Sequence, residues 1–214
     1  MLISKIMTKH PVYVQSDLSL TDTRALMERE QVGHLPVLNK NNDLVGLITR
    51  ADILKAGPSL ATSLDVFEIN YLLAKLTVEK AMVKNVITVQ EDEVVEKAAK
   101  IMADRGLGCL PVLNRTLLVG IVTDTDIFRF FVNAFGARHK GARITINFKE
   151  QPGQVAAFAG TIANEGGNIV AMVTSEGDDV AHRRVTFKIT ELALSAVEAA
   201  ARALNGVEIE DIRE

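Results

Sequence analysis

The chain has very little cysteine, no excess of basic residues and no long apolar run. Its 214 residues include a single cysteine, Cys109, so no internal disulfide can form and we expect a reducing compartment. With 24 Lys and Arg against 27 Asp and Glu, the formal net charge is −3, which lacks the basic footprint of non-specific nucleic-acid binding. No apolar stretch approaches the ~20 residues of a membrane span, and the first residues do not resemble a signal peptide. These absences predict a cytoplasmic protein that binds neither nucleic acid nor membrane.

The first two thirds of the chain contain an internal repeat. Residues 3–38 match residues 78–113 at a constant offset of 75, and the run Leu35–Asn39 recurs unchanged as Leu110–Asn114. The offset then drops to 74, because the following turn is one residue longer in the first copy. A length change confined to a turn is the kind that a repeat tolerates. Two copies indicate a duplicated unit and not a solenoid.

Each copy is predicted to fold as strand, helix, strand, strand, helix. In the first copy, Ser19 and Asp22 fit a capping box that opens the first helix. In the second, Val94 and Met102 belong to the apolar stripe of the corresponding helix. Between the copies, residues 60–76 are predicted to form a helix that bridges the repeats and packs against them.

Each copy also contains the same corner between its last strand and last helix: a glycine, two apolar residues, a threonine, and an aspartate three places later. Thr49 and Asp52 form it in the first copy, and Thr123 and Asp126 in the second. The simplest interpretation is a capping box, in which the threonine and the acid satisfy free amides at the helix start. The same geometry also suits a ligand, since free amides at a helix N-terminus attract phosphate. The residues alone leave both interpretations open.

The repeated pattern resembles CBS domains (cystathionine-β-synthase domains), which occur in tandem pairs called Bateman modules. The features that carry the resemblance are the Gly-x-x-Pro segments Gly33–Pro36 and Gly108–Pro111, the two corners, and their arrangement in register. The resemblance implies one CBS domain over residues 1–58, the bridging helix over 59–77, and a second CBS domain over 78–133.

CBS pairs bind adenosine derivatives, so the resemblance implies a role for each matching residue. Asp52 and Asp126 would hold ribose hydroxyls, while Thr49 and Thr123 would lie near a phosphate. The purine would lie against the two proline strands, at His34, Leu35, Pro36, Cys109, Leu110 and Pro111.

The two corners are not expected to be equivalent. Arg50 could reach a phosphate in the first, whereas Asp124 at the matching place in the second would repel one. His34 and Cys109 occupy equivalent positions, which favours a packing role for both. Four scattered histidines offer no convergent metal ligands, and Cys109 has no base nearby in the sequence to make it a nucleophile.

The last third of the chain has a different pattern. Residues 134–141 are expected to be a linker and 142–214 a separate domain with the order β-α-β-β-α-β, the split βαβ arrangement of ferredoxin-like folds. Ser195 and Glu198 fit a capping box at the start of its second helix. The turn at Pro152–Gly153 and the strand start at Gly167–Ile169 are similar to those of ACT domains. The overall fold class expected is therefore α/β (α+β).

The ACT resemblance implies an amino-acid effector bound between paired domains. By position, Gly153, Gln154 and Val155 would form a loop near its charged groups, and Asn168 and Ile169 would meet it from the adjoining strand edge. The alternative is that Gly153 simply starts a helix and Gly167 follows its end.

The order CBS-CBS-ACT resembles the bacterial acetoin-utilisation protein B-like family. The resemblance implies a homodimeric, non-catalytic regulator that senses AMP, ADP, ATP or S-adenosylmethionine, with a metabolic enzyme as its target. The alternative is a structural subunit with vestigial clefts that docks on a partner enzyme or transporter. An enzyme is the least favoured interpretation, because the sequence has no P-loop, zinc-spaced ligand set or nucleophile elbow. We therefore expect neither a metal nor a catalytic cofactor.

Overall fold

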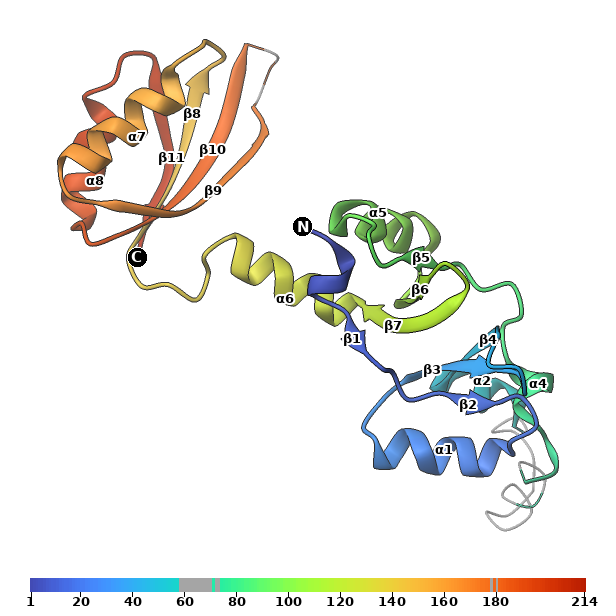
Figure 1. Ribbon diagram of the computed structural model, residues 1–214. Coiled ribbons are helices and arrows are strands. Elements are labelled where there is room, and N and C mark those ends of the chain that lie inside the picture. Colours follow the sequence, from blue (N-terminus) through green and yellow to red (C-terminus); the bar gives the residue numbers. More distant parts are fainter. Residues whose placement is uncertain (58–70, 72–73, 178, 180) are drawn as a thin grey trace. The chain divides into compact units, whose positions relative to one another are not determined.

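The computed structural model describes residues 1–57, 71, 74–177, 179 and 181–214 (Figure 1). The chain forms two compact units, residues 1–127 and 128–214, and each is described by itself. The bridging helix predicted over residues 60–76 falls largely outside the described part of the chain.

The first repeat forms a three-stranded sheet in the order β2-β3-β4. The first two of these strands are parallel and the last two antiparallel. The elements are η1 (Ile3–Lys5), β1 (Thr8–Lys9), β2 (Val14–Gln15), α1 (Leu20–Arg29), β3 (His34–Leu38), β4 (Leu44–Thr49) and α2 (Arg50–Ala56).

The second repeat follows the same plan, with a sheet in the order β1-β7-β6-β5. Its first member, β1, belongs by sequence to the first repeat. The elements are α4 (Val78–Ala81), β5 (Val89–Gln90), α5 (Val95–Arg105), β6 (Cys109–Asn114), β7 (Leu117–Thr123) and α6 (Asp124–Ala134).

The two repeats exchange their leading segments. Thr8 in β1 pairs with Ile121 in β7, and Val83, 75 residues after Thr8, forms an antiparallel bridge with Leu47 in β4. Each segment covers the exposed edge of the other repeat's last strand, where unpaired backbone groups would otherwise remain. The sheet of each repeat is therefore completed by residues from the other.

The helix that follows the first strand of each repeat's own sheet, α1 after β2 and α5 after β5, is capped differently in the two copies. Ser19 caps α1 by accepting the backbone N–H of Asp22 at 3.0 Å, which confirms the serine half of the predicted capping box, while the Asp22 carboxylate accepts the Ser19 hydroxyl at 2.7 Å. Val94 occupies the equivalent N-cap position of α5, is 40% exposed, and forms an isolated bridge with Leu2. The assignment of Val94 to the buried stripe is wrong, because the stripe begins one residue later with Val95, which is fully buried.

The C-terminal unit is a four-stranded antiparallel sheet in the order β11-β8-β10-β9, covered on one face by two helices (Figure 1). This arrangement confirms the predicted β-α-β-β-α-β order. The elements are β8 (Ala142–Lys149), α7 (Gln154–Asn164), β9 (Asn168–Glu176), β10 (His182–Thr190), α8 (Leu194–Arg202) and β11 (Val207–Arg213).

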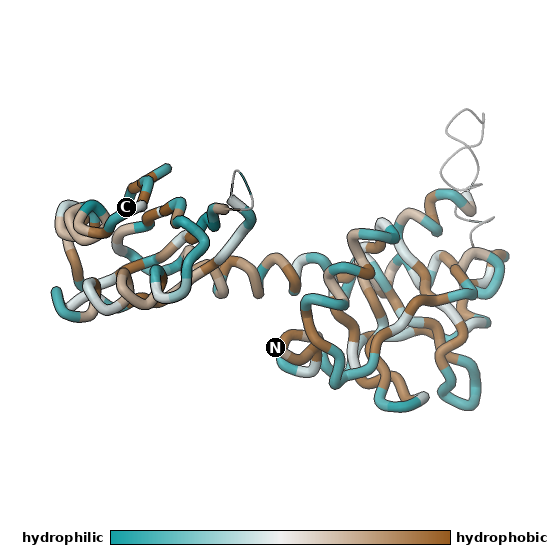
Figure 2. The backbone as a smooth tube through the Cα atoms, turned by 90° about the horizontal axis from the view of Figure 1, so that it is seen from above, coloured by the Kyte–Doolittle hydropathy of each residue, from teal (hydrophilic) through white to brown (hydrophobic). Residues whose placement is uncertain are grey.

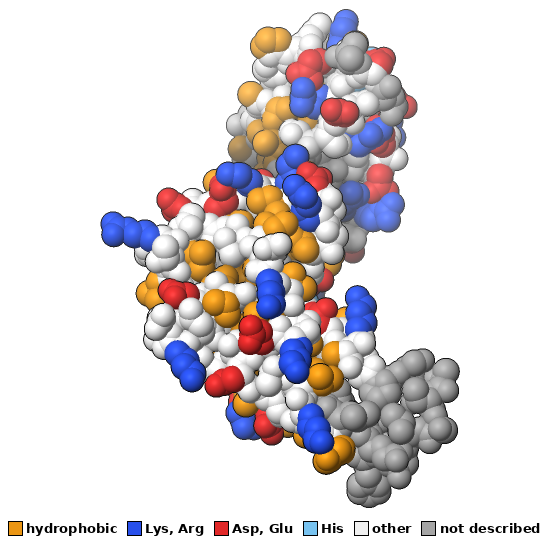
Figure 3. Space-filling model, turned by 90° about the vertical axis from the view of Figure 1, so that its right-hand side faces the viewer, with side chains coloured by type: hydrophobic (Ala, Val, Ile, Leu, Met, Phe, Trp, Pro, Cys, Tyr) orange, Lys and Arg blue, Asp and Glu red, His pale blue; other side chains and the backbone are white. Residues whose placement is uncertain are grey.

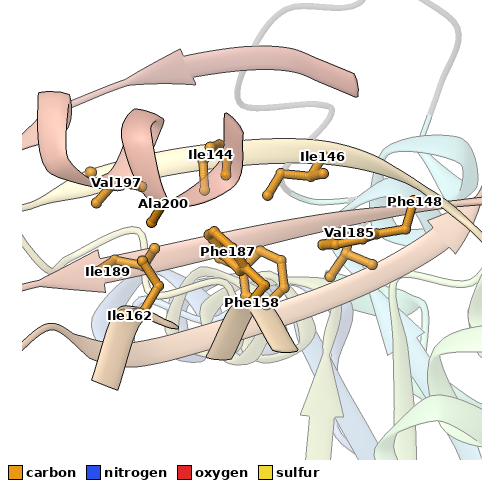
Figure 4. Close-up of a cluster of buried hydrophobic side chains, with 12 residues drawn as sticks. Ile144, Ile146, Phe148, Phe158, Ile162, Val185, Phe187, Ile189, Val197 and Ala200 are labelled. Atoms are coloured by element: carbon orange, nitrogen blue, oxygen red, sulfur yellow. The ribbon is translucent and has the colours of Figure 1, made fainter. Parts of the chain in front are cut away.

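Three phenylalanines from the sheet and α7 form the centre of the C-terminal core (Figure 4). Phe158 and Phe187 lie with ring centroids 4.7 Å apart, and Phe148 contacts both at 6.2–6.3 Å. Such tilted pairs are favoured over face-to-face stacking. Figure 2 shows the hydropathy of each residue along the backbone, with hydrophilic turns joining more apolar strands and helices.

The capping box predicted at Ser195 is wrong. The N-cap of α8 is Ala193, without a side-chain hydrogen bond, so Ser195 lies inside the first helical turn. Glu198 instead pairs with Arg202 one turn later, at 2.7 Å. The sequence pattern placed the helix start two residues too late because a Ser-x-x-Glu spacing also fits the interior of a helix.

Candidate functional site

The first corner joins β4 to α2 through a complete capping box. Thr49 donates its backbone N–H (2.9 Å) and its hydroxyl (2.7 Å) to Oδ2 of Asp52. The backbone N–H of Asp52 in turn donates to Oγ1 of Thr49 at 3.2 Å. Thr49 has the extended backbone of an N-cap, so one oxygen of the carboxylate is fixed against the helix start.

The second corner repeats this arrangement closely. Thr123 donates to Oδ2 of Asp126 from its backbone N–H at 3.0 Å and from its hydroxyl at 2.8 Å. The backbone N–H of Asp126 in turn donates to Oγ1 of Thr123 at 3.3 Å. The main difference is burial, because Asp126 is only 8% exposed whereas Asp52 is half-buried. Two carboxylates are therefore held in the same orientation by local chemistry that the sequence predicted.

The glycine that begins each corner is required by a methionine of the other repeat. A Cβ on Gly46 would overlap Sδ of Met82, and one on Gly120 would overlap Sδ of Met7. The motif glycines thus admit the exchanged segments that precede β1 and follow α4. Sequence comparison of the repeats aligned the two methionines, but it gave no sign of their contacts.

Strand pairing brings the proline strands to the corners. His34 lies opposite Thr49 in the β3–β4 ladder, and Cys109 lies opposite Thr123 in the β6–β7 ladder. Of the six proline-strand residues predicted to contact a purine, only His34 is half-buried. The side chains of the others, Leu35, Pro36, Cys109, Leu110 and Pro111, are buried.

His34 reaches across to the second repeat. Its Nε2 is 3.2 Å from the point where a Cβ on Gly108 would stand. Burial lowers the pKa of His34 below its ordinary value of 6.5, the negative charges of Asp124 and Asp52 oppose that shift, and Arg50 adds to it. The imidazole is therefore surrounded by charged groups from both corners.

Cys109 occupies the equivalent place in the second repeat but has different chemistry. Burial, reinforced by the negative charge of Asp124, raises the pKa of its thiol to about 12. The thiol therefore stays protonated near neutral pH, and a thiol in that state is a poor nucleophile. This supports the packing role expected from the sequence.

The two residues that distinguish the corners are held differently. Arg50 donates from Nη2 to the backbone carbonyl of Met27, near the end of α1, at 3.4 Å. Asp124 accepts the backbone N–H of Thr125 at 2.6 Å through Oδ1. The guanidinium is thus drawn toward the end of α1, while Asp124 keeps its negative charge beside His34.

The predicted effector residues of the C-terminal unit do not meet within one chain. Gly153, with φ of +90°, is the N-cap of α7. It follows the end of β8 at Lys149 by four residues. Lys149 pairs with the start of β10, whereas Asn168 at the start of β9 pairs with Thr190 at its end. Gln154 and Val155 therefore lie at one end of the sheet, and Asn168 and Ile169 lie at the other.

The described part of the chain shows neither a metal cluster nor a membrane-spanning helix. No three His, Cys, Asp or Glu side chains among those residues converge as metal ligands would. None of the described helices is both long and apolar enough to cross a bilayer. On the face shown in Figure 3, acidic and basic side chains are interspersed over the described surface.

Comparison with known proteins identifies the paired repeats. Residues 3–59 and 78–133 match the family model of the CBS domain, so the chain belongs to the CBS-domain family and carries a tandem pair. The chain is 34% identical over 131 residues to an L-aspartate semialdehyde sulfurtransferase of Methanocaldococcus jannaschii. The match covers 61% of this chain but only 23% of that protein, so the chain spans less than a quarter of this relative.

Two solved structures resemble the pair. The CBS domain pair of protein MJ0100, in complex with 5′-methylthioadenosine and S-adenosyl-L-methionine, is 33% identical with a TM-score of 0.53, covering 65% of this chain and 98% of that chain. An acetoin utilization protein (AcuB) of Vibrio cholerae is 27% identical with a TM-score of 0.54, covering 64% and 95%.

Proposed function

We propose that this protein is a non-catalytic regulator that senses adenosine-containing ligands at its two Thr–Asp corners. The observation that carries the proposal is the duplicated carboxylate, fixed through Oδ2 by a threonine in each repeat. The CBS pair of MJ0100, a third identical to this chain, was solved with two adenosine derivatives. AMP, ADP, ATP and S-adenosylmethionine are the candidate ligands, and no catalytic cofactor is part of the proposal.

Capping and ligand binding are compatible at these corners. An ionised carboxylate accepts several hydrogen bonds on its two oxygens. In the first corner, the bonds from Thr49 use Oδ2 of Asp52, which leaves Oδ1 to accept ribose hydroxyls. The cap then orients the carboxylate, since both bonds hold it in one rotamer before any ligand arrives. This preorganisation lowers the entropic cost of binding.

The two corners should prefer different ligands. Arg50 has donors beyond its single bond to Met27, and a phosphate within reach would compete for them as a charged partner. Asp124 places a fixed negative charge in the second corner. We therefore assign phosphorylated ligands to the first corner and uncharged or cationic adenosine derivatives to the second.

The C-terminal unit would supply dimerisation and a second effector. β9 is an edge strand of its sheet. If two copies paired antiparallel through β9, Asn168 of one chain would lie beside the end of the sheet that carries Gly153 in the other. Pairing of this kind would complete the amino-acid site of an ACT domain from two chains. Ligands at either site would then bias one arrangement of the homodimer and so control a partner enzyme.

Calorimetric titration with AMP, ATP and S-adenosylmethionine tests the proposal. The wild type should bind at least one of them, and Asp52→Ala and Asp126→Ala should each abolish one site. Asp22→Ala is the matched control, because the Asp22 carboxylate accepts the hydroxyl of the N-cap Ser19 at a helix start that lies outside both corners. If none of the three binds the wild type, or if Asp22→Ala is as damaging as the corner variants, the proposal fails.

One observation favours the alternative of an interaction subunit with vestigial clefts. Five of the six side chains predicted to contact the purine are buried, which leaves His34 as the accessible one. In that case the protein should co-purify with a fixed partner enzyme or transporter and show no thermal shift with any nucleotide.

A further inference from the structure

A cleft of about 360 Å³ lies between the two repeats, away from both corners. Asp43 and Leu44 border it at the beginning of β4, and Thr116 borders it just before β7. The corners lie at the opposite ends of these strands, about 16 Å away along β4 and about 20 Å away along β7, at ~3.3 Å per residue. The cleft is thus separate from the proposed adenosine sites, and its volume is in the range of small-molecule pockets.

The lining of this cleft combines an apolar wall with two cations. Leu44, Val86 and Leu113 supply the apolar side chains, while Lys84 and Arg115 supply the charges. The hydroxyls of Thr88 and Thr116 add donors. This is the composition expected of a site for a small organic anion, in which the apolar body packs and a few polar groups fix the orientation.

Arg115 is presented to the cleft by a backbone conformation that arginine rarely adopts. Its φ is +56°, in the left-handed region that favours glycine or asparagine. The Gln90 side chain holds this conformation, since it accepts the Arg115 N–H at 2.9 Å and donates to the Arg115 carbonyl at 3.2 Å. In the first repeat the positive-φ residue of the corresponding turn is Asn42, and asparagine adopts this left-handed conformation at a lower energetic cost than arginine.

Neither cation is strongly engaged within the protein. In the described part of the chain, the Arg115 guanidinium makes no hydrogen bond or ion pair. Lys84 faces Glu79 at 3.8 Å, with both side chains more than 60% exposed, and such surface pairs contribute little. Asp43, the one acid of the lining, already accepts a bond from Asn39 at 3.0 Å.

We propose that this cleft binds a small organic anion, whose phosphate or carboxylate is held by Lys84 and Arg115. The apolar part of the ligand packs on Leu44, Val86 and Leu113. Lys84 follows Val83, which is bridged to the first repeat's sheet, and Arg115 belongs to the second repeat. A ligand in the cleft therefore joins the two repeats at a point independent of the corners.

Titration of ¹⁵N-labelled protein at constant ionic strength tests this, with inorganic phosphate and benzoate as separate probes. At least one probe should shift the amides of Thr88, Arg115 and Thr116 in a saturable way. Saturation by phosphate alone assigns a phosphate ligand, and saturation by benzoate assigns a carboxylate with an apolar body. If neither probe saturates, the proposal is overturned.

The variants are chosen so that the turn stays folded. Arg115→Asn removes the guanidinium but keeps a residue that tolerates positive φ, and it should weaken binding about tenfold or more, as should Lys84→Gln. Lys40→Asn, at the position equivalent to Arg115 in the first repeat, should leave binding unchanged. Equal affinity in Arg115→Asn and wild type would refute the assignment. The double variant Asp52→Ala/Asp126→Ala should still bind the probe, which separates this proposal from that of adenosine sensing.

Discussion

The imidazole of His34 in the first repeat lies against Gly108 of the second, with Nε2 3.2 Å from the point where a Cβ at residue 108 would stand. At the equivalent glycine of the first repeat, Gly33, no heavy atom of the described residues lies within 4 Å of the point where a Cβ would stand. The difference follows from the sequence, because Cys109 is too short to make the reciprocal contact. The two otherwise similar repeats are therefore asymmetric where they meet.

Gly108→Ala should displace the His34 ring, whereas Gly33→Ala should not. A methyl group at residue 108 would force the imidazole to move by a few tenths of an ångström, and the ring would change its exposure and its distance to Asp124. Proton NMR titration of His34 should show a changed pKa in Gly108→Ala and the wild-type value in Gly33→Ala. Identical titrations in both variants would contradict the contact.

Gly46→Ala should destabilise the first unit through overpacking against Met82. Such insertions into a packed site cost about 1–3 kcal/mol. Urea unfolding should show this loss, and Met82→Ala added to the variant should recover part of it, giving a favourable coupling energy between the two substitutions. Gly160→Ala, on an open face of α7, serves as the control and should stabilise by about 0.5–1 kcal/mol. Strict additivity of Gly46→Ala and Met82→Ala would argue against the contact.

The free energy of unfolding should decrease as pH falls below about 6.5, because His34 titrates in this range. Its folded pKa lies below the ordinary value of 6.5, so the unfolded chain binds more protons between these two values. The stabilisation is complete above about pH 6.5 and is lost as pH falls toward the folded pKa. Asp124, Asp52 and Arg50 face the ring, but His34→Gln removes only the imidazole. Urea unfolding at pH 5.5 and 7.5 should show a smaller pH difference for His34→Gln than for wild type, and an equal difference would be incompatible with the shift.

Cys109 should resist modification in the folded protein. With a thiol pKa of about 12 and 4% exposure, it presents almost no thiolate at pH 8. Reaction with iodoacetamide should be slow in buffer and fast in urea. Fast labelling of the native protein would show that the β6 strand opens or that the thiol is exposed.

The features predicted correctly from the sequence are those set by local chemistry. Thr49 and Asp52 form the expected cap because a threonine at a strand end and an acid three residues later can satisfy each other without distant help. The exchange of Thr8 and Val83 between sheets was not predictable, since two-residue strands have no periodicity to read. The Arg115 cleft was missed because its lining comes from turns that are far apart in sequence. A basic residue in a tight turn was the one available signal.

What Asp52 and Asp126 hold can be seen in a crystal structure of the protein grown with a mixture of AMP, ATP and S-adenosylmethionine. Adenosine sensing at the corners predicts density for an adenosine ligand in at least one of them, with its ribose hydroxyls bonded to the carboxylate of Asp52 or Asp126. A phosphorylated ligand should occupy the corner of Arg50. Empty corners at saturating ligand, or an adenosine bound elsewhere with both carboxylates serving only as helix caps, would contradict it.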